Sequence, residues 1–326
     1  MKIALVVVAA ALFVIVATVV LFRSTRADLP APASMATLPD ALDIHLAARE
    51  ARFDDLRAGA EKKIVWHDPT TKRRTPLAIV YLHGFSATRR EAFPLAETVA
   101  DSLGANLFLT RLSGHGRDGE AMAEATVADW LADVREAMAV AARLGERTVL
   151  VGLSTGGTLA VWAATRPDWK DQLEALVLIS PNLGPRDVRA GLLLWPGGLT
   201  LTRWIQGPER AWEPQNEQHA AHWTTRYPVE AVATMMRLVT GVRRLDPSEI
   251  VTPVLLLHSD RDTVIRVDRA IDVFDRMESD RSERVVVSGV GDEDGHVLAG
   301  DVLSPGTTDR VVRAIVGFVR GDSTRD

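Results

Sequence analysis

The sequence predicts an α/β fold built on a mostly parallel sheet with helices on both faces, and two features carry this prediction. Short apolar runs alternate with segments of helical spacing over most of the chain, a pattern typical of repeated βαβ units. One of these runs leads into the turn Gly152-Leu-Ser-Thr-Gly156 and then into an alanine-rich segment. An N-terminal transmembrane helix is expected ahead of this fold.

The composition is that of an ordinary globular protein and excludes several kinds of function. The chain has 326 residues, of which 47% are hydrophobic and 25% charged, as in most folded domains. A net charge of −5 offers no basic surface for nucleic acid. The absence of cysteine excludes disulfides and a thiol nucleophile.

Residues 1–26 have the pattern of a membrane anchor. From Ile3 to Phe22 there are 20 consecutive residues of which only Thr18 is polar, enough to span a bilayer core as a helix. A cleaved signal peptide is the alternative, but its apolar region is shorter and its cleavage site lies close behind. Positive charges flank both ends of the stretch, so charge alone hardly decides its orientation. The short N-terminal tail favours a catalytic body outside the cytoplasm.

Residues 27–61 read as a linker followed by a helix. Residues 28–37 are rich in proline and alanine, and residues 39–56 show helical spacing of apolar side chains. We expect this helix to pack on the body formed by residues 62–326.

The body alternates predicted strands and helices. The strands are expected at 63–66 (an edge strand), 77–82, 106–111, 148–153, 173–179, 251–258 and 284–290. The helices are expected at 94–103, 127–144, 155–166, 267–277 and 309–319. Alternation of this kind predicts parallel strands joined by crossover helices.

An interval of about 65 residues without a core strand is too long for a bare loop in a compact domain. It follows the strand at 173–179 and contains Trp195, Trp204, Trp212 and Trp223, half of the eight tryptophans. We interpret residues 185–250, approximately, as a helical and aromatic cap over the active site. Its apolar side chains would either line an acyl-chain pocket or hold the cap to the body.

Ser154 is the expected nucleophile. A strand that turns into a helix within one residue leaves no room for side chains beside the turn, which explains Gly152 and Gly156. The serine hydroxyl is then held clear of the backbone, in the strand–turn–helix context that defines a nucleophile elbow. The helix behind it directs free N–H groups at the same place.

A serine nucleophile needs a base and an orienting acid, which in such elbows follow in the order acid, then histidine. His296 follows the last strand and is the expected base. Asp260 and Asp262 both follow the strand at 251–258, and we favour Asp262 because the apolar pair Val264-Ile265 would anchor its loop. Asp292, Glu293 and Asp294 are interpreted as solvated loop charges, one of which could tune His296.

The oxyanion of a tetrahedral intermediate needs two N–H donors. Thr155, directly after the nucleophile, is one, and Phe85, in the turn after the strand at 77–82, is the other. His83 and His115 are expected to brace loops rather than act as bases. No histidine has metal-ligand spacing, and the sequence implies neither a metal nor a cofactor.

These segments together resemble an α/β-hydrolase-fold serine hydrolase, and within it the lysophospholipase, monoglyceride-lipase and carboxylesterase branch with a helical cap. The resemblance rests on His83-Gly84-Phe85, Arg111-Leu-Ser-Gly-His-Gly116, the Ser154 elbow, the Asp262 turn and Gly295-His296, and covers residues 62–320. It implies the same oxyanion, nucleophile, acid and base positions. The acidic run Gly291-Asp-Glu-Asp-Gly295 departs from the short turn that usually precedes the histidine.

We therefore expect a membrane-tethered serine esterase or lipase for small esters with an apolar, lipid-like acyl part. Acyl transfer, thioester cleavage and removal of small N-terminal residues use the same groups and stay open as alternatives. A non-catalytic binding scaffold on the same fold would be marked by an incomplete triad.

Overall fold

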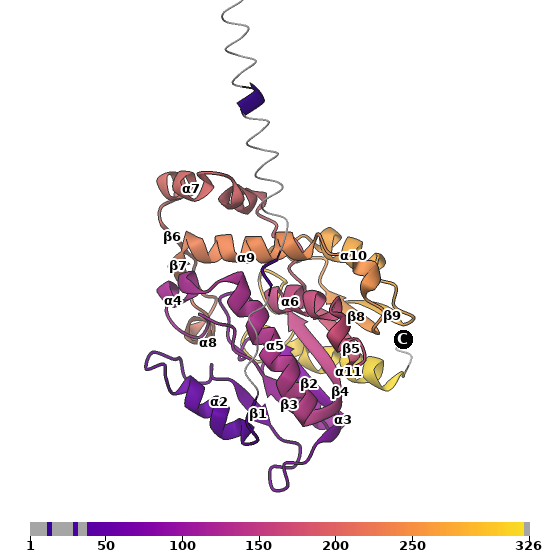
Figure 1. Ribbon diagram of the computed structural model, residues 1–326. Helices are drawn as coiled ribbons and strands as arrows, with labels where there is room; N and C mark the ends of the chain where they lie inside the picture. The colour runs from indigo at the N-terminus through magenta and orange to yellow at the C-terminus, as the bar shows by residue number, and fades with distance from the viewer. Residues whose placement is uncertain (1–11, 15–28, 32–37, 323–326) are drawn as a thin grey trace, which may run out of the picture.

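A seven-stranded sheet forms the centre of the molecule (Figure 1). The computed structural model describes residues 12–14, 29–31 and 38–322. The strands follow the order β1-β3-β2-β4-β5-β8-β9 across the sheet. Their bounds are β1 Lys63–Val65, β2 Thr75–Leu82, β3 Asn106–Leu109, β4 Gly145–Leu153, β5 Leu173–Ile179, β8 Val254–His258 and β9 Ser282–Val286.

All neighbouring strands of this sheet run parallel except β1, which pairs antiparallel with β3 at the edge. The predicted parallel sheet and its edge strand are thus confirmed. Parallel strands end at one edge, so the segments that follow β2, β4, β8 and β9 meet there. The strands predicted at 251–258 and 284–290 are too long. The pairing of β8 with β9 extends only from Val254 with Ser282 to His258 with Val286.

Helices cover both faces of the sheet, as predicted. Helices α5 (Val127–Leu144) and α6 (Thr155–Ala164) pack on one face, and α3 (Leu95–Leu103) and α11 (Thr308–Arg320) on the other. The side chains of β2 alternate between the two cores: Val80 joins the α5 side and Tyr81 the α3 side. Two apolar cores explain why the central strands are apolar without interruption.

An insertion between β5 and β8 forms the cap. Its elements are η2 Val188–Leu194, α7 Gly198–Gln206, β6 Glu209–Ala211, α8 Glu217–His222, β7 Arg226–Pro228, α9 Val229–Val242 and η3 Pro247–Glu249. Strands β6 and β7 form a small antiparallel ribbon that the sequence did not predict. Helix α9 packs on α6, and α7 lies beyond α9 at the outer edge of the molecule (Figure 1).

The remaining elements connect or flank this core. They are α2 Leu42–Glu50, α4 Gly119–Glu124, η1 Pro167–Trp169, α10 Val267–Asp275 and η4 Pro305–Thr307. Helix α2 is shorter than the predicted 39–56 and buries Leu42 and Leu46 against the body. Its last residue, Glu50, forms a buried ion pair with Arg111, which fixes the segment to the loop after β3.

The predicted membrane anchor, residues 1–26, and most of the predicted linker lie outside the described residues, apart from 12–14 and 29–31. Within the part of the chain that the structure describes, none of the helices is long and apolar enough to cross a membrane.

Candidate active site

Ser154 lies in a strained turn at the carboxyl end of β4. Its φ is +52° and its ψ −114°, a backbone conformation that is rare for residues with a side chain. Hydrogen bonds hold the turn on both sides: Ser154 N–H donates to the carbonyl of Ile179, and the N–H of Asn182 donates to the Ser154 carbonyl. The end of β5 and the loop after it therefore fix this conformation.

Two glycines allow the chain to cross itself beside Ser154. A Cβ on Gly156 would collide with the carbonyl oxygen of Leu82, and one on Gly152 with the carbonyl oxygen of Gly156. Neither backbone oxygen has room to move, since both lie in the packed centre of the fold. This steric requirement is the one that the sequence pattern predicted.

His296 and Asp262 form a hydrogen-bonded pair. Their side chains are joined by a bond of 2.7 Å between His296 Nδ1 and Asp262 Oδ2. The other oxygen of Asp262 accepts from the N–H groups of Val264 and Ile265 at 2.8 and 3.0 Å. The carboxylate is therefore fixed in one orientation, and it holds Nδ1 so that Nε2 of His296 is the ring nitrogen available as a base. Asp260, the other candidate acid, is exposed.

The acidic loop before His296 is not uniformly solvated, which corrects the interpretation of Asp292. Glu293 and Asp294 are exposed, but Asp292 is buried. One oxygen of Asp292 accepts from the backbone N–H groups of His296 and Val297 at 2.9 and 2.8 Å. The other accepts from the side-chain amide of Gln215 in the cap at 2.7 Å. Asp292 thus organises the loop that presents the histidine.

These carboxylates set the protonation of His296. Burial lowers the pKa of His296, but the charge and hydrogen bond of Asp262, together with the charge of Asp292, outweigh it and raise the pKa above its usual 6.5. A raised pKa makes the imidazole a stronger base for the proton of a serine hydroxyl.

The turn after β2 carries Phe85, the first proposed oxyanion donor. His83 braces this turn: its Nε2 accepts from the N–H of Leu112 at 3.0 Å, and its Nδ1 lies 2.9 Å from the Gly84 carbonyl. Burial lowers the pKa of His83 well below its usual range, so the ring is neutral. Thr155, the second proposed donor, begins α6, where N–H groups have no partner within the helix.

Glu91, which the sequence analysis did not single out, lies directly behind this turn. Its Oε1 accepts from the Gly84 N–H at 2.7 Å and from the Tyr81 hydroxyl at 2.9 Å. Burial raises the pKa of Glu91 to about 8, so the carboxyl is neutral at pH 7. In the sequence, Glu91 is marked only as a lone carboxylate between the turn at Gly84 and the apolar start of α3.

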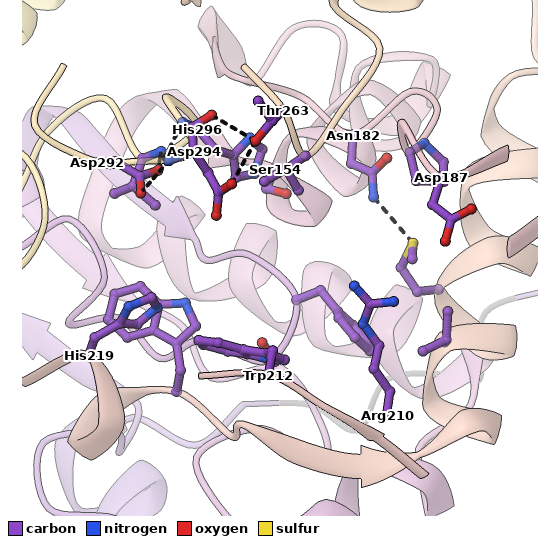
Figure 2. A pocket seen from close by; sticks show the side chains of 18 of the residues that line it. Ser154, Asn182, Asp187, Arg210, Trp212, His219, Thr263, Asp292, Asp294 and His296 are labelled. Carbon is purple, nitrogen blue, oxygen red and sulfur yellow. Dashed lines mark hydrogen bonds between the residues drawn. The ribbon is translucent and has the colours of Figure 1, made fainter. Parts of the chain in front are cut away.

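Ser154 and His296 face one cavity of about 420 Å³ between the body and the cap. Figure 2 shows Ser154 and His296 on one wall and Arg210, Trp212 and His219 of the cap opposite them. This volume lies in the range of small-molecule sites.

Two of the four cap tryptophans line the cavity, and the other two neither line it nor lie buried against the body. Trp212 and Trp223 line the cavity, and both pack against His219, with ring centroids 4.9 and 4.4 Å away. Trp195 and Trp204 are exposed at the surface of the cap and line no part of this cavity. Among residues 12–14, 29–31 and 38–322, no group of three acidic or histidine side chains is placed to hold a metal ion.

A nucleophile elbow, an Asp–His pair after the following strands and a cap over a shared cavity define a serine hydrolase of the α/β-hydrolase class. Sequence comparison agrees with that class. The chain belongs to the Hydrolase_4 family, described as serine aminopeptidase S33, which matches residues 74–291. The match ends before His296.

A curated relative is the thermostable monoacylglycerol lipase of Bacillus sp. (strain H-257). It is 29% identical over 220 residues, which cover 67% of this chain and 83% of the relative. With the family, this similarity makes the chain a carboxylic ester hydrolase of the lipase and esterase type.

Solved structures show the same fold. A structure reported for LipS and LipT, two metagenome-derived lipolytic enzymes, superposes with a TM-score of 0.66 at 21% identity, covering 82% of this chain and 99% of that one. A soluble variant of monoglyceride lipase from Saccharomyces cerevisiae superposes with a TM-score of 0.61 at 14% identity, covering 90% and 99%. The monoacylglycerol lipase of Paleococcus ferrophilus gives 0.57 at 16% identity, covering 80% and 98%.

Proposed function

We propose that this protein hydrolyses carboxylic esters through Ser154 as nucleophile, His296 as base and Asp262 as orienting acid. The observation that carries the proposal is the shared cavity: Ser154 and His296 line it together, while Asp262 fixes the far nitrogen of the histidine. Phe85 and Thr155 donate their backbone N–H groups to the oxyanion.

The reaction runs in two halves. Nε2 of His296 takes the Ser154 proton as Oγ attacks the ester carbonyl, and the resulting imidazolium is stabilised by the Asp262 carboxylate. Collapse of the tetrahedral oxyanion breaks the ester bond, and His296 returns the proton to the departing alcohol. Water, deprotonated by the same nitrogen, then attacks the acyl-enzyme and releases the carboxylic acid and free Ser154.

The substrate we propose is a long-chain monoester of a small polyol. The Bacillus relative is named a monoacylglycerol lipase, and the cavity offers different linings for the two ends of such a molecule. Trp212, Val232 and Met235 provide apolar wall for an acyl chain. Asn182 and Gln215 add polar side chains to the same cavity for the hydroxyls of a head group.

The full chain in detergent, with p-nitrophenyl esters of increasing acyl length and with 1-monoacylglycerols, tests this proposal. We expect turnover that peaks at one chain length and is lost in Ser154→Ala. Matched thioesters and aminoacyl p-nitroanilides belong in the same series, because acyl transfer, thioester cleavage and aminopeptidase activity use the same triad. Faster turnover of an aminoacyl anilide than of any ester would replace the esterase proposal by the peptidase one.

We further propose that residues 3–22 anchor the protein in a membrane with the catalytic body outside the cytoplasm. The support is the sequence: 20 residues with a single polar side chain between flanking positive charges, a length that spans the hydrocarbon core. Carbonate-washed membranes should retain the chain, and protease added to intact cells or spheroplasts should digest its body. Release by carbonate would overturn the anchor, and protection from protease would reverse its orientation.

A further inference from the structure

The outer surface of the cap carries a concentration of exposed apolar side chains. Between residues 38 and 322, ten large apolar side chains are exposed, and six of them fall within residues 188–205. On α7, Leu201, Trp204 and Ile205 are 49%, 84% and 63% exposed. The other four exposed side chains are Ile44, Val251, Val264 and Val286, widely separated along the chain. Isolated apolar side chains are normal on a surface, whereas a cluster marks an interaction site.

The three side chains form one stripe because they are spaced i, i+3 and i+4 on a helix. Leu199, at the start of the same helix, instead packs against the apolar core that the cap shares with the body. Helix α7 is therefore amphipathic with its more apolar face outward, the reverse of a surface helix that stabilises a fold. Leu192 and Trp195, at 43% and 59% exposed, extend this surface from η2. We call these five residues the cap face.

The chain arriving from the N-terminus reaches the body beside the cap face. Leu29 is seated on α9 at Gly241, where a Cβ would collide with the leucine side chain. The same residue borders a cleft of about 630 Å³ that is also lined by Trp195, Leu199 and Thr200. The glycine in the last turn of α9 therefore provides the seat that fixes the entry point.

This entry point limits how far the cap can lie from a membrane. Six residues separate Phe22, the end of the apolar stretch, from Leu29, so the two Cα atoms lie about 25 Å apart at most when the chain is fully extended. Helix α7 itself is only about 13 Å long, at 1.5 Å per residue. A bilayer that holds residues 3–22 is thus within one short tether of the cap face, whereas α2 lies on the opposite side of the molecule (Figure 1).

We propose that the cap face docks into the interface of the same bilayer that holds the anchor. This inference rests on the anchor proposed above. Trp204, Leu201 and Ile205 enter the boundary between head groups and acyl chains, as apolar faces of interfacial helices do. Asp187 and Ala190, just ahead in the chain, line the catalytic cavity. Docking therefore places one rim of that cavity at the membrane surface, where a monoester resides.

The absence of cysteine from the chain allows a direct measurement of depth. A nitroxide spin label is placed on Trp204→Cys or on Ile44→Cys, a comparably exposed position (72%) on α2, in the full chain reconstituted in phosphatidylcholine–phosphatidylglycerol vesicles. Collision rates with oxygen, which enters the bilayer, and with a water-soluble nickel chelate report the depth. We expect the oxygen-to-nickel ratio to be about tenfold higher at 204 than at 44, as for a side chain buried in the acyl boundary.

Each other outcome overturns the inference in a distinguishable way. Equal ratios at the two positions, in chain that survives a carbonate wash, would leave the anchor in place and refute docking. Chain that washes off would refute the anchor and the docking together. Spin–spin broadening at 204 that disappears on dilution with unlabelled chain would show that a second copy covers the cap face. Turnover of soluble p-nitrophenyl acetate, measured on the same samples, reports the esterase proposal separately.

A functional readout uses the triple variant Leu201→Ser, Trp204→Ser, Ile205→Ser, with Ile44→Ser as the matched control. None of these residues lines the catalytic cavity, so hydrolysis of soluble p-nitrophenyl acetate should stay unchanged in both. Hydrolysis of monoacylglycerol embedded in the vesicles should fall about tenfold in the triple variant only, since docking supplies the apolar burial that orients the cavity. An unchanged rate on embedded substrate would contradict the proposal.

Discussion

Glu91→Gln should remove a loss of activity that the wild-type enzyme is expected to show above about pH 8. Burial raises the pKa of the Glu91 carboxyl to about 8, although Gly84 and Tyr81 donate hydrogen bonds to it. The group is therefore neutral at pH 7 and becomes negative as the pH rises. That charge then lies behind the turn that is proposed to hold the oxyanion, where a negative charge opposes the transition state.

The structure sets the size of the effect. Oε2 of Glu91 lies 2.9 Å from the position of a Cβ on Gly84, and that position is 3.3 Å from Cβ of Ser154. Oε2 is therefore no more than about 6 Å from Cβ of Ser154, the residue on which the oxyanion forms. A negative charge at about 6 Å raises the free energy of an oxyanion by about 2.8 kcal/mol at an effective dielectric constant of about 20. This corresponds to a loss of about 100-fold in kcat/KM once Glu91 is fully ionised.

The assay is the pH dependence of kcat/KM for p-nitrophenyl butyrate from pH 5.5 to 9.5. Wild-type activity should rise as His296 loses its proton and fall above about pH 8 as Glu91 ionises. Glutamine keeps an acceptor oxygen for Gly84 and Tyr81, so the variant should be active at pH 7 and lose the alkaline decline. The control is Glu97→Gln: burial also raises the pKa of Glu97, which borders a different cleft. An alkaline decline that persists in Glu91→Gln would refute the reasoning.

Three other substitutions test separate parts of the structure. Asp262→Asn should lower kcat by about 10³–10⁴-fold and shift the acid limb of kcat/KM to lower pH, because His296 loses the carboxylate that raises its pKa; an unshifted limb would exclude this pairing. Glu50→Gln should cost about 3–5 kcal/mol in urea unfolding at pH 7, because it leaves the charge of Arg111 buried and unpaired. Burial raises the pKa of Glu50, but the hydrogen bonds and charges of Arg111 and Lys62 together outweigh burial and lower it below 4.5. The stabilisation is therefore present above pH 4.5 and is lost as the pH falls through the lowered value. A difference from wild type that persists at lower pH would contradict this. Trp212→Ala should raise KM for long-chain esters by about tenfold, through lost apolar contact of about 1.4 kcal/mol, and leave p-nitrophenyl acetate unaffected; equal effects on both substrates would indicate a structural role.

The central strands and the elbow could be predicted because local sequence determines them. The apolar run before Ser154 is buried on both faces of the sheet, and the glycines beside it are required by backbone atoms a few residues away in space. Such steric requirements leave a short, recognisable pattern. The order of acid and histidine follows from the order of the strands in the sheet, so Asp262 and His296 could be named as well.

The roles of Glu91 and Asp292 could not be predicted from local sequence. Each carboxylate is defined by backbone N–H groups that surround it after folding: Gly84 for Glu91, and His296 and Val297 for Asp292. A charged residue in a loop has the same sequence appearance whether it is solvated or buried. Only the folded chain distinguishes the exposed Glu293 from the buried Asp292.

The sequence predicted the cap as an aromatic insertion, but it did not predict which of the tryptophans face the cavity. The elements beside the cavity-lining tryptophans are short: Trp212 lies just after the three-residue strand β6, and Trp223 follows the six-residue helix α8. Segments of this length carry no periodicity from which an inner face can be read. Which tryptophans line the cavity is decided by packing against the body.

The measurement that tests the central proposal most directly is covalent labelling of the nucleophile. The full chain is titrated with an alkyl fluorophosphonate, residual esterase activity is followed, and the modified residue is identified by mass spectrometry of the digested protein. We expect one label per chain on Ser154, activity lost in proportion to labelling, and a folded but unlabelled and inactive Ser154→Ala variant. A label on another residue, or esterase activity retained after Ser154 is fully modified, would contradict the assignment of Ser154 as the nucleophile.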